Sequence, residues 1–255
     1  MSSLSGKNFL VTGVANSKSI AWAISKELVS EGANIALTYV NEAIEKRVRP
    51  LAEELGGVDV FPLDVASDES VEKLFAALSE KWGSMDGLVH SIAFAEREDL
   101  ARSFSETSRS GFLKALEISA YSLIQLSKFA SGLMTNGGSI VTLTYLGSEK
   151  VIPNYNVMGV AKAALEASVR YLAAELGEKG IRVNALSPGP IKTLAASGIR
   201  GFKEMLSAFA NKCPMKRNVS AEEVASAAKF LLSKDSRGIT GEVIYVDCGY
   251  NIMGM

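Results

Sequence analysis

The sequence has few of the residues that build covalent or metal-bound frameworks. Its 255 residues include two cysteines, Cys213 and Cys248, and a single histidine, His90. Two cysteines are too few for the disulfide framework of a small secreted protein or for a cysteine-ligated zinc site, so we interpret both as small buried apolar residues. One histidine argues against a histidine-rich metal centre, and we therefore expect no metal site.

Long apolar runs and an excess of one charge are also missing. No stretch reaches the roughly 18 consecutive apolar residues of a membrane span. An apolar N-terminal stretch that loosely resembles a secretory signal is interrupted by polar residues 16–19. The 27 Lys and Arg residues nearly balance 28 Asp and Glu residues, which gives no overall attraction to nucleic acid or to an anionic membrane. We expect a cytoplasmic protein with neither of these partners.

Short aliphatic runs alternate along the chain with longer stretches of helical period, which is the pattern of a parallel sheet with crossover helices. Runs such as IALTY and SIVTL are continuously apolar, as expected for strands buried on both faces. We predict strands at 8–12, 34–39, 58–62, 87–92, 139–143, 182–186 and 242–246.

These strands predict an α/β fold, a Rossmann-like doubly wound parallel sheet of about seven strands with helices on both faces. No linker rich in Pro, Gly or Ser divides the sequence, so we expect residues 1–255 to form a single dinucleotide-binding and catalytic domain. Ligands of such sheets bind beyond the carboxyl ends of the strands.

Three sequence signals define helix ends. Ser67 is placed to cap the third helix, and Ser220 with Glu223 predicts a capping box at the start of the last one. Pro50 falls inside the second helical stretch, where its missing N–H predicts a kink or a break.

The first predicted strand is followed by Gly13 and, six residues later, Ser19 at the mouth of a helix. A glycine turn before a helix N-terminus is where a pyrophosphate meets free amides and the positive end of the helix dipole. The later glycines of the dinucleotide fingerprint are replaced by other residues. Gly13 as an ordinary tight turn and Ser19 as a helix cap explain the spacing equally well.

The second predicted strand is followed by Val40 rather than by a cation that could hold a 2′-phosphate, which favours NADH over NADPH. The preference is mild because Lys46, Arg47 and Arg49 lie nearby in sequence. Asp64 follows the third strand, where its carboxylate could accept a hydrogen bond from an adenine amino group or could serve only as a turn or capping residue.

Tyr155 and Lys162 open a stretch of helical period. Seven residues at about 100° each bring the two side chains within about 20° of one helix face and about 10.5 Å apart along the axis. They can therefore serve one site. A tyrosine and a lysine at this spacing also occur often in ordinary surface and core positions.

Several motifs are distributed along nearly the whole chain. They are Thr-Gly-Val-Ala-Asn-Ser-Lys-Ser-Ile-Ala at 12–21, Leu-Asp-Val at 63–65, His-Ser-Ile-Ala-Phe-Ala at 90–95, Tyr145, Tyr155 with Lys162, Asn-Ala-Leu-Ser-Pro-Gly-Pro-Ile-Lys-Thr at 184–193 and Tyr-Val-Asp-Cys-Gly-Tyr at 245–250. Taken together, these motifs closely resemble the bacterial enoyl-(acyl-carrier-protein) reductases, an NADH-dependent, divergent branch of the short-chain dehydrogenase/reductases.

The tyrosine spacing separates this branch from most of the superfamily. Ordinary short-chain dehydrogenases have the pattern Tyr-x-x-x-Lys, but the position four residues before Lys162 is Met158. Tyr155 lies about one helical turn further from Lys162 than the usual tyrosine does. This greater distance suits a longer acceptor. In an enoyl thioester, hydride goes to C3 while negative charge accumulates on the thioester oxygen, two bonds further along.

The resemblance implies that NADH reduces the C2–C3 double bond of trans-2-enoyl thioesters, the last step of the type II fatty acid elongation cycle. Tyr155 would donate to the developing enolate oxygen, and Lys162 would bind the nicotinamide ribose. Tyr145 matches the second active-site tyrosine of the family; it could equally be a simple lining of the pocket.

The resemblance also implies the remaining site residues. Those expected to bind the cofactor are Gly13, Ser19, Ile20, Val40, Asp64, Val65, Ile92, Lys162, Ile191, Lys192, Thr193, Leu194 and Ala195. Those expected to bind the substrate are Ala95, Tyr145, Tyr155, Ala196, Ile199 and Phe202. The family also implies a structural role for His90, a homotetramer, and binding of diphenyl-ether inhibitors beside Tyr155.

A basic segment stands out in this nearly neutral chain. Residues 192–217 contain one acidic residue, Glu204, and six basic ones, a local charge of +5 against −1 for the whole chain. The basic residues are Lys192, Arg200, Lys203, Lys212, Lys216 and Arg217. We expect residues 192–210 to form a helical lid over the acyl chain that meets an acidic acyl carrier protein, although a solvated helix face would show the same charges.

Two other functions stay open at this point. An ordinary short-chain ketone or alcohol oxidoreductase is disfavoured by Met158, which stands where its tyrosine belongs. A nicotinamide-binding regulator without catalysis is disfavoured by the presence of both Tyr155 and Lys162.

Overall fold

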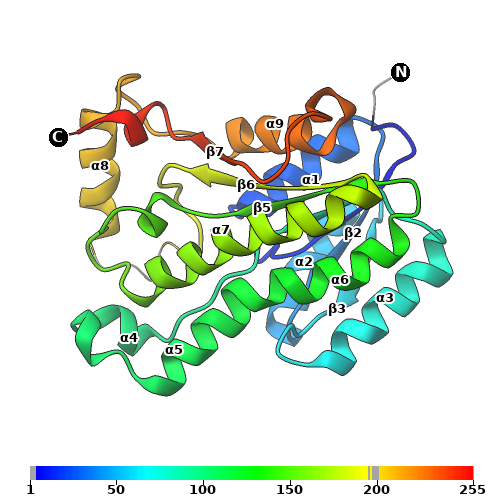
Figure 1. Ribbon diagram of the computed structural model, residues 1–255, viewed down its shortest axis with the longest axis horizontal. Helices are drawn as coiled ribbons and strands as arrows, with labels where there is room; N and C mark the ends of the chain where they lie inside the picture. Colours follow the sequence, from blue (N-terminus) through cyan, green and yellow to red (C-terminus); the bar gives the residue numbers. More distant parts are fainter. Residues whose placement is uncertain (1–3, 195, 197–200, 255) are drawn as a thin grey trace.

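The computed structural model describes residues 4–194, 196 and 201–254, and they are organised around one seven-stranded sheet. Every neighbouring pair of strands runs parallel, in the order β3-β2-β1-β4-β5-β6-β7 (Figure 1). The strands are β1 (Asn8–Val11), β2 (Asn34–Tyr39), β3 (Asp59–Pro62), β4 (Gly87–His90), β5 (Gly138–Leu143), β6 (Ile181–Pro188) and β7 (Val243–Val246).

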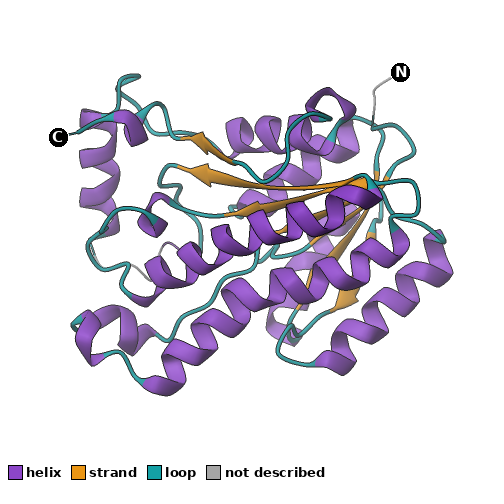
Figure 2. Ribbon diagram, viewed as in Figure 1, coloured by secondary structure: helices purple, strands orange, loops and turns teal. Residues whose placement is uncertain are grey.

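Helices cover both faces of this sheet (Figure 2). One apolar cluster joins the sheet to α1 (Ile20–Ser30), α2 (Glu42–Glu54) and α9 (Ala221–Leu232). A second cluster, on the other face, joins it to α3 (Asp68–Trp82), α6 (Ser122–Leu133) and α7 (Val157–Leu176). The predicted fold class is confirmed, and each of the seven predicted strands overlaps an observed one.

The helix signals are mostly confirmed. The Ser67 hydroxyl accepts a hydrogen bond from the Ser70 amide at 3.2 Å, and Ser220 and Glu223 form the reciprocal capping box. Of the kink or break predicted at Pro50, the break is wrong, because α2 continues through it to Glu54. Val48 and Leu51, on either side of the proline, are buried in the first apolar cluster, and this packing compensates for the backbone hydrogen bond that proline cannot make.

Additional elements lie beyond the carboxyl ends of the strands. The connection between β4 and α6 forms α4 (Arg97–Ala101), a short 3-10 turn (Phe104–Glu106), α5 (Arg109–Leu116) and one π-helical turn (Glu117–Tyr121). A further helix, α8 (Phe202–Lys212), follows β6, and the arrowheads of β6 and β7 point toward it in Figure 1. Among the described residues, no helix is long and apolar enough to cross a bilayer.

Candidate active site

Gly13 lies in the tight turn after β1 and has a φ of +85°. A Cβ at this position would lie 1.9 Å from the carbonyl oxygen of Ser91, which follows β4. Only glycine allows the two backbones to approach so closely at this φ. The close packing of the two strand ends therefore requires glycine at position 13.

Ser19 shapes the same turn in a way that differs from helix capping. Although it occupies the N-cap position of α1, its side chain makes no capping hydrogen bond. Its hydroxyl instead accepts from the Ala15 and Asn16 amides at 3.0 and 3.2 Å. The first turn of α1 contains no acidic residue. The positive end of the helix dipole thus faces a closed glycine turn, an arrangement that fits a pyrophosphate.

The end of β2 presents Val40, whose surface is 55% exposed. Among the nearby cations, Arg49 lies close to this end, with its guanidinium 5.9 Å from the centre of the Tyr39 ring, but its Nε donates to Glu45 at 2.7 Å. A 2′-phosphate would have to compete with Glu45 for this arginine. The arrangement agrees with the predicted preference for NADH.

Asp64 lies in the turn after β3, followed by the buried Val65. One Asp64 carboxylate oxygen accepts from the Ala66 amide at 3.0 Å, and the Asp64 amide donates to Ser70 at 2.9 Å. Its turn-forming role is thus present. The side chain stays exposed, so a second bond to an adenine amino group is compatible with this geometry.

Tyr145 and Tyr155 form an aromatic pair just beyond the end of β5. Their ring centres are 4.9 Å apart at an interplanar angle of 68°, the edge-to-face arrangement that aromatic pairs favour. Two glycines make room for them: a Cβ at Gly147 would lie 2.4 Å from the Tyr155 ring, and one at Gly159 would lie 2.7 Å from the Gly147 carbonyl oxygen. The Tyr155 ring is therefore closely packed by its surroundings.

The helical placement predicted for Tyr155 is wrong. The chain forms a turn at this residue, and α7 begins only at Val157. Between them, Asn156 has a φ of +40° and a ψ of −122°, which no helical residue adopts. The angle and axial distance counted to Lys162 on one helix therefore do not apply. The Glu166 carboxylate nevertheless acts on the pKa values of both Tyr155 and Lys162, so this turn leaves both side chains near one carboxylate.

Lys162 is 5% exposed on the inner face of α7, and its Nζ donates to the Leu143 carbonyl oxygen at the end of β5 at 2.7 Å. Burial lowers its pKa to about 8, against the opposing effect of the nearby Glu166 carboxylate. The buried Glu166 accepts a short hydrogen bond from the Thr144 hydroxyl. Lys162 is therefore charged at neutral pH and held at the strand end.

The two tyrosines have raised pKa values. Burial is the main cause for both, with Tyr250 adding to the rise at Tyr145. Tyr145 and the Glu166 carboxylate add to the rise at Tyr155. Both phenols therefore stay protonated and can donate a hydrogen bond across the whole pH range in which Lys162 titrates.

His90 is fully buried at the end of β4. Its two ring nitrogens lie 2.8 Å from the hydroxyls of Thr142 and Ser122. Burial and the nearby Lys162 charge lower its pKa to about 3, so the ring is neutral. Both nitrogens are occupied within the core, as expected for a structural residue.

Ser119, in the π-helical turn, contacts the segment after β4, and no sequence signal pointed to it. Its hydroxyl accepts from the Phe94 amide at 2.9 Å and lies 3.1 Å from the Phe94 carbonyl oxygen, next to the half-buried Ala95. It also lies 4.0 Å from the sulfur of Met158. The position of the usual dehydrogenase tyrosine is thus occupied by a methionine that is only 6% exposed.

The segment after β6 approaches the tyrosine pair. The Tyr145 hydroxyl lies 3.7 Å from the sulfur of Met205 in α8, and Phe209 of the same helix stacks on Tyr250 at 3.5 Å. Of the other predicted site residues, Ile92, Ile191, Thr193, Ala196 and Phe202 are half-buried, whereas Lys192 and Leu194 are exposed. Ala195 and Ile199 lie outside the described residues.

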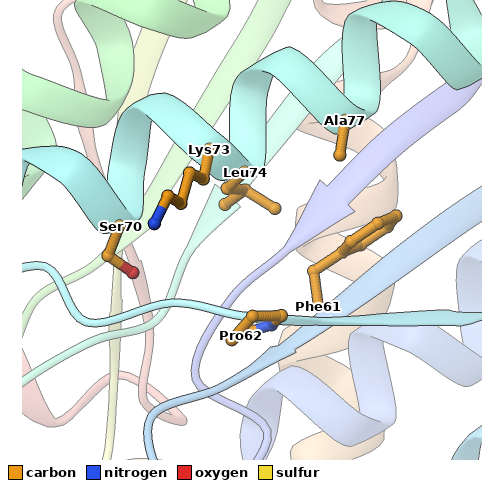
Figure 3. Close-up of a pocket in the computed structure, with 6 residues that line it drawn as sticks. All are labelled: Phe61, Pro62, Ser70, Lys73, Leu74 and Ala77. Atoms are coloured by element: carbon orange, nitrogen blue, oxygen red, sulfur yellow. The ribbon is translucent and has the colours of Figure 1, made fainter.

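A hollow elsewhere in the molecule lies far from the tyrosine pair. It lies between the edge strand β3 and α3 (Figure 3) and is lined by Phe61, Pro62, Ser70, Lys73, Leu74 and Ala77. Three strands separate β3 from β5 in the sheet, which at about 4.8 Å per strand spacing is about 19 Å.

The sequence matches a known protein family over nearly its whole length. Residues 13–251 match the family model described as enoyl-(acyl carrier protein) reductase. The chain belongs to this family. A Rickettsia felis relative named enoyl-(acyl-carrier-protein) reductase (NADH) is 56% identical over 251 residues, which are 98% of this chain and 96% of the relative. A Nostoc relative of the same name is 52% identical and matches over the full length of both chains.

Solved structures of this family show the same fold. The Bacillus cereus enoyl-acyl carrier protein reductase, solved with NADP+ and an indole naphthyridinone, superposes with a TM-score of 0.98 at 50% identity over all of both chains. The Anaplasma phagocytophilum reductase, solved with NAD, superposes with a TM-score of 0.96 at 50% identity, covering 100% of this chain and 97% of that one.

Proposed function

We propose that this chain is an NADH-dependent enoyl-(acyl-carrier-protein) reductase of fatty acid synthesis. It reduces the C2–C3 double bond of trans-2-enoyl thioesters to saturated acyl thioesters. Its membership of the family over nearly its whole length is the observation that decides the proposal, and full-length relatives are named for NADH. Loss of NADH absorbance with a crotonyl thioester, but not with a 3-ketoacyl thioester, distinguishes this function from that of a ketone reductase; a regulator without catalysis would show neither.

In the proposed mechanism, bound NADH supplies a hydride to C3 of the enoyl thioester. Tyr155 donates a hydrogen bond or proton to the thioester oxygen, where the negative charge of the enolate develops. Its raised pKa keeps the phenol protonated before this step. The Tyr145 ring packs edge-on against that of Tyr155 and limits the directions in which the phenol can point.

We propose that residues at the ends of the strands bind the cofactor. Gly13, Ser19 and Ile20 would meet the pyrophosphate, and Val40, Asp64 and Val65 the adenosine. Lys162 would bind the nicotinamide ribose hydroxyls and add positive potential beside the enolate. Ile92 and the segment Ile191, Lys192, Thr193, Leu194 and Ala195 would line the nicotinamide, and Ala95, Ala196, Ile199 and Phe202 would contact the acyl chain together with the tyrosines.

The Lys162 charge predicts a pH dependence. Its pKa of about 8 lies below the ordinary lysine value, so the charge is present below pH 8 and is lost as the pH rises through that value. The kcat/KM for NADH is expected to fall above this pH with a limiting slope of about one log unit per pH unit. The Lys162→Met variant should have a lower kcat/KM for NADH than the wild type, and this kcat/KM should not change with pH over this range. A wild-type profile that stays level to about pH 10 contradicts a lowered pKa for Lys162, and a kcat/KM of Lys162→Met equal to that of the wild type contradicts the proposed role.

We further propose that residues 192–210 cover the acyl chain as a lid and that the basic segment docks the acidic carrier protein. Lys212 is exposed on α8, which suits this role. The positive charge is smaller than the count over 192–217 indicates, because Arg217 pairs with Glu223 at 2.6 Å, just beyond that segment. Arg200 and the Lys203 side chain lie outside the description.

Charge reversal tests the docking surface. Lys212→Glu is expected to raise KM about 3- to 10-fold for carrier-linked substrate, since a misplaced rim charge weakens steering, and to leave KM for a coenzyme A thioester unchanged. Lys179→Glu is the matched control and should change neither KM, because this exposed lysine lies just before β6, at the end of the strand opposite to the one that leads to α8. Equal effects of Lys212→Glu on both substrates would refute docking at this segment.

We infer a homotetramer from the family resemblance, and the surface supports self-association. Tyr121, Ile124 and Tyr171 are 52%, 41% and 80% exposed on the π-helical turn, α6 and α7. Large apolar side chains gathered on neighbouring helices suit contact with a second copy.

The same proposal extends to location and inhibitors. A cytoplasmic location agrees with two unpaired cysteines and with the use of NADH. A diphenyl ether could stack on the nicotinamide beside the Tyr145–Tyr155 pair, which supplies aromatic surface.

A further inference from the structure

Asn156, directly after Tyr155, has a backbone that asparagine adopts only at a cost. Its φ of +40° and ψ of −122° are the mirror image of an extended conformation, which glycine occupies without strain and a residue with a Cβ does not. If the backbone angles were the only requirement at this position, glycine would meet it best. The presence of asparagine therefore indicates a use for its side chain.

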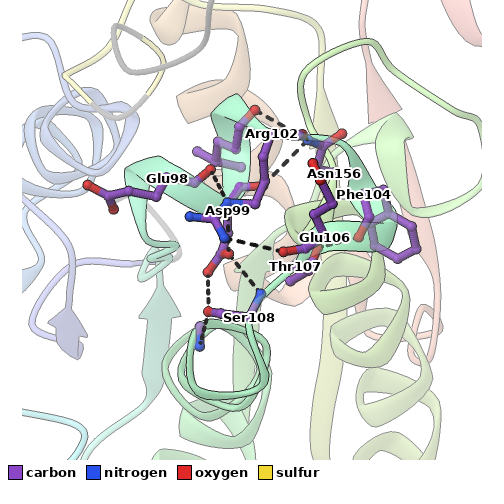
Figure 4. Close-up of polar contacts among 10 residues, drawn as sticks. Glu98, Asp99, Arg102, Phe104, Glu106, Thr107, Ser108 and Asn156 are labelled. Atoms are coloured by element: carbon purple, nitrogen blue, oxygen red, sulfur yellow. Dashed lines mark hydrogen bonds and ion pairs between the residues drawn. The ribbon is translucent and has the colours of Figure 1, made fainter.

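The Asn156 side chain binds a different part of the chain. Its Nδ2 donates to the carbonyl oxygen of Arg102 at 2.8 Å, and it lies 3.2 and 3.4 Å from those of Leu100 and Asp99 (Figure 4). These carbonyls are at the C-terminal end of α4, where helical carbonyls have no partner within the helix. One amide thus fastens the turn that holds Tyr155 to the end of α4.

The segment that Asn156 binds is itself braced. Asp99, which is 1% exposed, accepts from both the amide and the hydroxyl of Ser108 at 2.9 Å, and the Ser108 hydroxyl accepts in turn from the Gly111 amide at the start of α5. Arg102 donates to the carbonyl oxygens of Glu98 and Glu106. Figure 4 shows these contacts converging between α4 and α5. Asn156 therefore fastens the turn that contains Tyr155 to a braced segment outside α7.

We propose that Asn156 is a positioning residue for Tyr155: its amide holds the turn against α4 so that the phenol points at the substrate oxygen. The proposal rests on the proton- or hydrogen-bond-donating role proposed for Tyr155. It also explains why the tyrosine can stand outside the helix that contains Lys162. The same contacts tie Tyr155 to the segment 95–108, whose Ala95 is proposed to meet the acyl chain.

Asn156→Gly separates the side chain from the backbone. Glycine adopts the native φ and ψ without strain, so the variant should fold with an unchanged or raised melting temperature, yet it lacks the amide. We expect kcat with a crotonyl thioester to fall about 10- to 100-fold, because small displacements of a catalytic group cost this much. The Kd for NADH should change less than about twofold, since Asn156 does not touch the proposed cofactor surface. Turnover equal to that of the wild type would overturn the proposal.

A double-mutant cycle with Tyr155→Phe tests whether Asn156 acts through the tyrosine. If it does, adding Asn156→Gly to Tyr155→Phe lowers kcat no further, and the two effects are strongly non-additive. Independent, multiplying effects would overturn the positioning role even if each single variant is slow. Full turnover of Tyr155→Phe alone would instead refute the role of the tyrosine, so the two failures are distinguishable.

Asn156→Asp provides a second readout that a merely structural role would not change. Ionised, the aspartate has no donor and faces three carbonyl oxygens; protonated, it regains one O–H donor. Its deficit in kcat relative to the wild type should therefore shrink as the pH is lowered toward the carboxyl pKa. A deficit that is constant with pH contradicts a role for donation to the α4 carbonyls.

Discussion

Tyr155→Phe is expected to lower kcat for an enoyl thioester about 10²- to 10³-fold, as for the loss of one hydrogen-bond donor to a developing oxyanion, with the Kd for NADH within about twofold of the wild-type value. The phenyl ring can keep the packing against Gly147 and the edge-to-face contact with Tyr145, so only the donor is removed. Steady-state turnover and fluorescence titration with NADH measure the two quantities separately.

Tyr145→Phe is the comparison variant for this experiment. The Tyr145 hydroxyl meets the sulfur of Met205, a weak acceptor, so a residue that only lines the pocket should lose little turnover. A loss close to that of Tyr155→Phe would make Tyr145 a second catalytic donor. Unchanged turnover of Tyr155→Phe, whatever Tyr145→Phe does, would refute the proposed role of Tyr155.

Gly13→Ala is expected to weaken NADH binding at least about 100-fold and to lower the melting temperature by several degrees. The new methyl group would lie 1.9 Å from the Ser91 carbonyl oxygen, and this backbone atom cannot swing aside as a flexible side chain could. The turn must therefore shift away from β4, which displaces the amides proposed to meet the pyrophosphate. The left-handed φ adds about 1–2 kcal/mol of strain.

Gly56→Ala is the matched control for the strain. Gly56 has a φ of +86°, almost the same as Gly13, but a Cβ there would meet nothing within 4 Å. This variant should lower the melting temperature slightly and leave the Kd for NADH unchanged. If Gly13→Ala binds NADH as well as Gly56→Ala does, the close approach to Ser91 has no part in forming the cofactor site.

The central strands could be predicted from sequence because burial on both faces leaves a continuous aliphatic run that needs no knowledge of distant contacts. The capping box at Ser220 is equally local. Pro50 shows the opposite case. Its effect on α2 depends on the packing of Val48 and Leu51 against the sheet, which no local signal reports.

In the candidate site, too, local signals could be predicted from sequence and contacts between distant residues could not. Lys162 could be chosen from sequence, but its anchoring by the Leu143 carbonyl oxygen and its neighbour Glu166 depend on how α7 lies against β5. The helical position predicted for Tyr155 was wrong because Asn156 has a positive φ and the helix begins only after it. An asparagine that follows a tyrosine does not by itself predict that conformation. Ser119 could not be chosen because its partner, Phe94, is 25 residues away in sequence.

Isotope transfer tests the central claim most directly. The enzyme would be supplied with a trans-2-enoyl thioester in ordinary water and with NADH that has deuterium at both C4 positions, and the product would be analysed by mass spectrometry and NMR. We predict a saturated acyl thioester with one deuterium at C3 and none at C2, because the hydride goes to C3 and the proton added at C2 comes from water-exchangeable groups. Deuterium at C2, or oxidation of NADH without a saturated product, would contradict the proposed reaction.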